Sequence, residues 1–297
     1  MKRYMSQILE AAFLFSLIVL FFMLSISSAK GQDSTKFSDL TQALATPSKV
    51  ESLVLKNQGL TKFPEEILRF PNLQFLDLSG NNISELPENV FEISKLEYLD
   101  LSGNSFSELP GSISRMKSLS ILRIGYLPNL DLKKAFPTIE GLENLKVLDL
   151  KYDNISELPE SIARLNQLES LDLSGNPIKV IPSSLSKLGR LEAFYLNDDA
   201  ELDLEKSIST LNSMPSLKEL HLENDGILMI PKEIVNMKKL ELLYLNNNKI
   251  QVLPKELDNM EKLRFIDMSR NPLPNQSLIN PDQLLAPKIN IRVKNNK

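Results

Sequence analysis

The segments LQFLDLSGNNISELP (Leu73–Pro87) and LEYLDLSGNSFSELP (Leu96–Pro110) are closely similar and begin 23 residues apart. The pattern returns as LKVLDLKYDNISELP from Leu145, LESLDLSGNPIKVIP from Leu168 and LELLYLNNNKIQVLP from Leu240. Self-similarity at one period of about 20–50 residues indicates a repeat architecture, in which each unit buries its apolar face against its neighbours. The sequence therefore predicts one continuous repeat domain.

Ten units cover residues 50–285 when the first apolar residue of each is taken as position 1. They begin at Val50, Leu73, Leu96, Leu119, Leu145, Leu168, Leu191, Leu217, Leu240 and Leu263. The units that begin at Leu119 and Leu191 have 26 residues and the others have 23. Ile289 and Ile291 match the apolar positions of an incomplete eleventh strand. Residues 286–297 are therefore expected to form a C-terminal cap strand and tail.

The spacing of apolar residues within a unit predicts its local structure. Leu76 and Leu78, at positions 4 and 6, alternate with polar residues, as in a short half-buried strand. Stacked copies would form a parallel sheet with strands about 4.8 Å apart. The proline at position 15, such as Pro87, would begin an extended or short helical return on the outer side. Residues 30–49 are expected to cap the first unit, with an amphipathic helix near Thr35–Ala45 whose Phe37, Leu40 and Leu44 face that unit.

Position 9 is expected to carry a ladder of asparagine side chains. An amide there can bond to backbone groups that the turn leaves open. The asparagines of this ladder are Asn81, Asn104, Asn176, Asn248 and Asn271. Gln58, Leu127, Asp153, Asp199 and Asp225 depart from it, so we expect a weaker ladder in the middle of the stack.

The pattern L-x-x-L-x-L-x-x-N-x-I/L-x-x-L/I-P resembles the leucine-rich repeat family, over about Val50–Val293. The 23-residue form is most similar to its bacterial and intracellular-signalling subtype. The segment Phe37–Pro64 is similar to the opening segment of secreted bacterial members. The resemblance implies an α/β solenoid, a right-handed horseshoe with a concave parallel sheet of about ten to eleven strands and convex helical or extended returns. It also implies a binding role without a catalytic site. Secreted animal and plant members usually have disulfide caps, so the absence of cysteine favours a bacterial origin.

Residues 1–29 have the pattern of a secretory signal peptide. Lys2 and Arg3 precede the apolar run Ala11–Leu24, and small residues follow. We expect cleavage after Ala29, with Gly31 as the second choice. An uncleaved anchor is the alternative, and it would be the only contact with a membrane. Either way the protein is expected to be exported, to the periplasm, the cell surface or the medium.

Composition argues against several functions. A net charge of −4 lacks the basic surface of a nucleic-acid binder. With no cysteine and one histidine, we expect no metal and no cofactor. The histidine, His221, has Tyr195 and Tyr244 as its expected strand neighbours rather than a serine and an aspartate, and no glycine-rich phosphate loop appears. We therefore expect no enzymatic activity.

The non-leucine slots beside each strand (positions 3, 5, 7 and 8) should face the concave side, which is the binding surface of a solenoid. All tyrosines beyond residue 29 occupy these slots, where tyrosine supplies contact area and a hydroxyl. Because the slots should be exposed, we expect these side chains to bury little until a ligand binds. The alternative is that aromatic residues simply suit strands. The candidate ligand-binding residues are Tyr98, Arg123, Tyr126, Lys151, Tyr152, Tyr195, Glu219, His221, Glu223, Tyr244 and Asn246. We predict a protein or peptide ligand and a monomer; a glycan or cell-wall binder and an architectural spacer or self-assembly unit are the alternatives.

Two further features leave alternatives open. The two 26-residue units lack proline at position 15 and should carry an outer helix, for example Leu204–Leu211. Their extra length either sets local curvature or forms a second recognition site on the outer edge. Asp77 and Asp100 should be neighbours on adjacent strands, as should Asp149 and Asp172. A calcium bridge is conceivable there, but a solvated acidic row is the expected arrangement.

Overall fold

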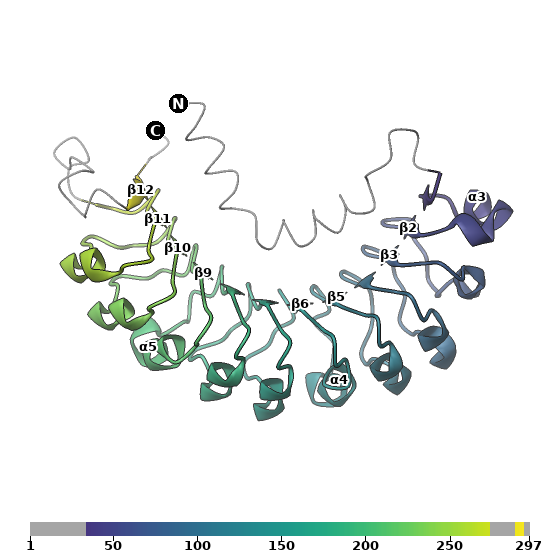
Figure 1. Ribbon diagram of the computed structural model, residues 1–297, viewed down its shortest axis with the longest axis horizontal. Helices are drawn as coiled ribbons and strands as arrows, with labels where there is room; N and C mark the ends of the chain where they lie inside the picture. Colours follow the sequence, from purple (N-terminus) through teal and green to yellow (C-terminus); the bar gives the residue numbers. More distant parts are fainter. Residues whose placement is uncertain (1–33, 274–288, 294–297) are drawn as a thin grey trace.

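The computed structural model describes residues 34–273 and 289–293. These residues form an open, curved parallel sheet of 12 strands that follow one another in chain order from β1 to β12 (Figure 1). The sheet lines the inner side of the curve and the helical returns lie on the outer side (Figure 1). The horseshoe solenoid is confirmed. The signal segment, its cleavage site and the alternative anchor lie outside the described residues. Within those residues, no helix has the length and apolar character needed to span a membrane.

Each repeat contributes one three-residue strand. The strands are β2 (Ser52–Val54), β3 (Phe75–Asp77), β4 (Tyr98–Asp100), β5 (Ile121–Arg123), β6 (Val147–Asp149), β7 (Ser170–Asp172), β8 (Ala193–Tyr195), β9 (Glu219–His221), β10 (Leu242–Tyr244) and β11 (Phe265–Asp267). An eleventh strand is present as predicted, β12 (Asn290–Arg292), but its register differs from the expected one: Ile291 pairs with Ile266, at position 4, instead of lying at position 6. The strand β1 (Lys36–Phe37) precedes the first repeat. Equivalent positions pair across every junction between repeats, for example Leu76 with Leu99.

The return segments follow the prolines as expected. Short 3-10 turns begin directly after position 15 at η2 (Glu65–Arg69), η3 (Glu88–Glu92), η4 (Gly111–Arg115), η5 (Glu160–Arg164), η6 (Ser183–Lys187), η7 (Lys232–Asn236) and η8 (Lys255–Asn259). The two long repeats carry α-helices instead, α4 (Leu132–Ile139) and α5 (Leu204–Asn212). The side chains of Asp131 and Asp203 cap these helices by accepting first-turn N–H groups.

The core is a set of leucine columns that run the length of the solenoid. Position 4 is represented by Leu53, Leu76, Leu99, Leu122 and Leu148, all fully buried. Because each leucine packs against the equivalent residue of the next repeat, one large-to-small substitution would remove contacts on both sides. Such changes cost about 2–5 kcal/mol in packed cores.

The N-terminal cap differs from the expected helix. Residues 36–37 form β1, which pairs with β2, and helix α3 covers only Leu40–Ala45. Asp39 begins this helix by accepting the N–H of Gln42 at 2.8 Å. A strand at this place gives the edge of β2 a hydrogen-bonding partner, which a helix would not supply. Phe37, Leu40 and Leu44 do pack against the core, as expected.

The asparagine ladder is confirmed at the residues expected to form it. Asn176 is typical: its Oδ1 accepts the N–H groups of Asp153 and Ile155, and its Nδ2 donates to the carbonyls of Leu150 and Leu173. One side chain therefore joins two consecutive repeats.

The aspartates at position 9 preserve half of this pattern. Oδ1 of Asp153, Asp199 and Asp225 accepts a backbone N–H of the preceding repeat. Their Oδ2 atoms are buried and have no hydrogen-bond partner among the described residues. Burial raises the pKa of Asp153 to about 7, of Asp225 to about 8 and of Asp199 to about 9. The ladder continues through these repeats but loses its donor half, which is the expected weakening.

Candidate binding face

The strand register brings the position-5 side chains into one row across the concave face. Near its middle, Arg123 on β5 lies between two carboxylates from neighbouring strands. Its guanidinium is 3.0 Å from Asp149 Oδ2 and 3.5 Å from Asp100 Oδ2, and it also donates to the Tyr98 hydroxyl at 3.4 Å. Lys151 adds a second cation 3.3 Å from Asp149. The expectation of a solvated acidic row is wrong here, because Asp100 and Asp149 are buried and paired with these cations.

The acidic pairs occur as the spacing predicted. Asp77 lies beside Asp100, and Asp149 lies beside Asp172. Oδ1 of Asp100 and Asp172 accepts the N–H two residues later, at 2.9 and 3.0 Å. This contact closes the turn after each strand, so the carboxylates have a structural role. No cluster of three or more acidic or histidine side chains suited to a metal occurs in residues 34–273 or 289–293.

Aromatic rings stack along the second half of the row. His221 lies between Tyr195 and Tyr244, with ring centroids 4.2 and 4.1 Å away. Its Nε2 is 2.8 Å from Glu219 Oε1 and its Nδ1 is 3.1 Å from Glu223 Oε2. Burial opposes a charge on this ring, but hydrogen bonds to the two glutamates outweigh it and raise the pKa of His221. A protonated imidazole between two electron-rich rings gains cation–π attraction on both faces.

A second aromatic pair lies at the rim of the concave face, at position 8. Tyr126 and Tyr152 stack with centroids 4.7 Å apart, and they are 49% and 37% exposed. The Tyr152 hydroxyl donates to Asp198 Oδ2 at 2.5 Å, two repeats further on. The ring reaches Asp198 by crossing Gly175, where an added Cβ would lie 2.3 Å from ring carbons.

Both rim tyrosines have backbone angles that favour glycine. Their φ values are +59° and +56°, in the left-handed region that position 8 occupies in every repeat. Glycine holds this position in three repeats, asparagine, aspartate or arginine in five, and an aromatic residue only in these two. A bulky side chain in this conformation is uncommon and costs on the order of 1–3 kcal/mol. The two exposed rings are therefore held at a conformational cost.

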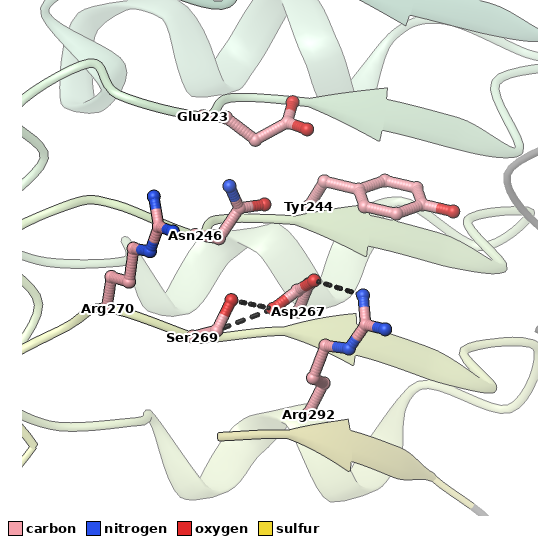
Figure 2. Close-up of a pocket in the computed structure, with 7 residues that line it drawn as sticks. All are labelled: Glu223, Tyr244, Asn246, Asp267, Ser269, Arg270 and Arg292. Carbon is pink, nitrogen blue, oxygen red and sulfur yellow. Dashed lines mark hydrogen bonds and ion pairs between the residues drawn. The ribbon is translucent and has the colours of Figure 1, made fainter. Parts of the chain in front are cut away.

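A polar pocket of about 510 Å³ opens at the C-terminal end of the concave face (Figure 2). Its lining comes from four consecutive units: Glu223, Tyr244, Asn246, Asp267, Ser269, Arg270 and Arg292. Asp267 lies at its centre: Oδ1 accepts hydrogen bonds from the backbone N–H and the hydroxyl of Ser269, and Oδ2 is 3.2 Å from Arg292 Nη1 (Figure 2). Carboxylate, amide, guanidinium and phenol groups thus converge on one hollow, an arrangement suited to the polar groups of a polypeptide.

Two family models match the chain over most of its length. A model described as a leucine-rich repeat region matches residues 46–135 and 121–224, and a second, described as a leucine rich repeat, matches residues 215–273. The chain belongs to the leucine-rich repeat family. Leucine-rich repeat proteins of this kind generally mediate protein–protein binding, and the family is typically a non-enzymatic scaffold.

Solved leucine-rich repeat structures share the fold. An internalin from Listeria monocytogenes is 22% identical, with a TM-score of 0.63 over 84% of this chain and 69% of its own. The Toll–Spätzle complex from Drosophila is 22% identical, with a TM-score of 0.65 over 87% of this chain. This chain covers 35% of that one, about a third of its length. Comparison with curated protein sequences gives no match.

The structure brings the sequence-predicted residues of the leucine-rich repeats into three groups. Arg123, Tyr98 and Lys151 join the ion-pair network, while Tyr126 and Tyr152 form the rim pair. A third group surrounds the histidine stack and the polar pocket: Tyr195, Glu219, His221, Glu223, Tyr244 and Asn246.

One expectation about these tyrosines is wrong. We expect from the sequence that they bury little until a ligand binds, but each stacks on a neighbouring ring. Tyr98 stacks on Phe75 at 4.0 Å, and Tyr244 also meets Phe265 at 5.4 Å. The sequence analysis also missed the pocket residues Asp267, Ser269, Arg270 and Arg292. The signal was available, because they occupy concave slots of the last repeat and the cap strand.

Proposed function

We propose that this chain is an exported, non-enzymatic binding module that takes a protein or peptide ligand on its concave face. The observation that carries this proposal is the pair Tyr126 and Tyr152. Their rings are exposed, and glycine, which is present at this position in neighbouring repeats, would adopt their left-handed backbone conformation with less strain. Strain of this kind at an exposed aromatic pair supports a role in binding rather than in folding.

The ring geometry favours a polypeptide over a glycan. Sugars stack on open aromatic faces, but the faces of His221 are taken by Tyr195 and Tyr244. Tyr152 has Tyr126 on one side and Gly175 beneath it. Ring edges, hydroxyls and charged groups face a ligand instead, and these suit backbone amides and polar side chains.

The comparisons agree with this proposal without identifying the ligand. One structure that shares the fold is a complex, that of Toll with Spätzle. From the family and from the surface described above, we infer that this chain also binds a protein through its concave face. We infer that it does so outside the cytoplasm.

A glycine replacement tests the proposal without damaging the fold. Y126G/Y152G restores the residue of neighbouring repeats, so relief of backbone strain should offset the lost ring stacking. The full chain and this variant would be immobilised and exposed to a surface-protein extract. Capture of a protein by the wild type and its loss in the variant, at an unchanged melting temperature, is the expected result. K255A/N259A, on the convex turn η8, is the matched control and should capture as the wild type does.

Other outcomes oppose the proposal. Equal capture by Y126G/Y152G would place the binding site elsewhere. Displacement of the captured protein by soluble polysaccharide would favour the glycan alternative. Self-association at increasing concentration, with no captured partner, would favour an assembly role.

A further inference from the structure

An apolar pocket lies at the outer edge of repeats 7 and 8. Its lining residues come from the return segments and not from the concave positions 3, 5, 7 and 8. Its volume is about 610 Å³, within the range of small-ligand and side-chain sites. Leu202 and Leu204 of repeat 7 form one wall, and Ile227, Leu228 and Met229 of repeat 8 form the other. The long repeat that the sequence singled out therefore borders a real hollow.

The pocket lies where the backbone contacts between repeats are interrupted. On one side, the N–H of Asp203 donates to the carbonyl of Lys179 at 2.8 Å. On the other, the N–H of Lys249 donates to the carbonyl of Ile227 at 2.9 Å. Among the described residues, no such bond joins the outer segments of repeats 7 and 8. The three extra residues of repeat 7 separate the two segments, and the space between them is the pocket.

The other long repeat provides an internal comparison. Repeat 4 has the same three-residue extension, and the repeat after it has Ser156 and Glu157 at positions 12 and 13. At those positions repeat 8 has Leu228 and Met229, which are 68% and 70% exposed. Core packing does not account for two adjacent apolar side chains that are mostly in solvent. Contiguous exposed apolar surface marks interaction sites.

The rim of the pocket is acidic. Asp203, Glu205 and Glu233 line it together with a single lysine, Lys232. Lys206 pairs with Asp203 at 2.6 Å, while no ion pair involves Glu205 or Glu233 among the described residues. A cationic group beside the apolar pocket would find complementary charge there.

We propose that this outer-edge pocket is a second peptide-binding site, which takes a large apolar side chain flanked by lysine or arginine from a partner polypeptide. The apolar side chain enters between Leu202 and Leu228, and the cationic neighbours lie against Glu205 and Glu233. This site is separate from the concave face, so it stands or falls independently of the proposed concave-face function.

Phage-displayed random dodecapeptides, panned on the full chain, test this site. L228S/M229E, which installs the pair found after repeat 4, serves for counter-selection. Both replaced side chains are mostly exposed, so the melting temperature should be unchanged. Peptides that bind the wild type and lose at least tenfold in affinity for this variant should pair an apolar residue with lysine or arginine. Fluorescence anisotropy with the synthetic peptides would measure the affinities.

Two controls keep the outcome clear. Val252 occupies the position of Met229 in the next repeat and is 69% exposed, but it does not line the pocket. V252S should therefore bind the peptides as the wild type does. Y126G/Y152G should also bind these peptides normally, because the concave rim is not involved. Peptides that bind L228S/M229E equally, peptides without the apolar–basic pairing, or no enrichment on the wild type would each overturn the proposal.

Discussion

Replacement of Asp199 by asparagine should stabilise the protein, and increasingly so as the pH rises. The Asp199 carboxyl is 2% exposed, its Oδ2 has no partner among the described residues, and burial raises its pKa to about 9. At the equivalent place Asn176 makes two N–H donations to carbonyls, at 2.9 and 2.7 Å. D199N would supply these donations and remove the titrating group.

The magnitude follows from the pKa. Since the folded pKa lies above the ordinary value of 3.8, the contribution of Asp199 to stability is complete below about pH 4. It is lost as the pH rises to about 9. At pH 7 the loss is at most roughly 4 kcal/mol, at about 1.4 kcal/mol for each pH step. Relaxation of the site reduces this figure, so we expect D199N to raise the free energy of unfolding by roughly 1–4 kcal/mol at pH 7.

Urea unfolding followed by circular dichroism at pH 5, 7 and 9 would measure this effect. The stability gain of D199N should be small at pH 5 and largest at pH 9. The reverse change, N176D, should destabilise, and more at pH 9 than at pH 5. A gain that does not vary with pH, or a D199N variant less stable than the wild type, would refute the reasoning.

Three further predictions concern the concave face. Because the pKa of His221 is raised in the folded state, protonation of its ring stabilises the fold fully below about pH 6.5, and this stabilisation is lost as the pH rises through the folded pKa. An NMR titration should find the pKa of His221 above that of a model histidine. H221Q should remove this part of the pH dependence of stability. G175A should cost roughly 1–3 kcal/mol of unfolding free energy, because its Cβ would meet the Tyr152 ring at 2.3 Å, whereas G103A, with its nearest atom at 3.6 Å, should cost less in the same thermal melts. R123Q should cost roughly 1–3 kcal/mol of unfolding free energy in the same melts, because Asp100 loses its cation and Asp149 keeps only Lys151.

Much of the fold could be predicted because each repeat independently supports the assignment of its neighbours. Each leucine at positions 4 and 6 confirms the assignment of the next, and every repeat junction then pairs equivalent residues. The two ends of the sheet did not follow this logic. At the C-terminal end, β12 pairs Ile291 with Ile266, two residues out of the 23-residue register. Phe37 lies in a strand because β2 needs an edge partner, and no neighbouring copy of the motif reveals that need.

The site was less accessible to sequence reasoning, because it depends on contacts between repeats. The spacing placed Tyr195 and His221 side by side, but not the two glutamates that bond the imidazole nitrogens. Nor does a sequence reveal that Gly175 lets the Tyr152 ring pass to Asp198. Such contacts depend on rotamers and on the rise from one repeat to the next.

Site-specific photocrosslinking tests concave-face binding most directly. A benzoylphenylalanine would replace Asn246, in the concave pocket, or Asn259, on the convex turn η8. Each full-length variant would then be irradiated with a surface-protein extract. The account predicts a crosslinked partner from position 246 and none from position 259. A partner crosslinked only from position 259, or from neither position, would contradict it.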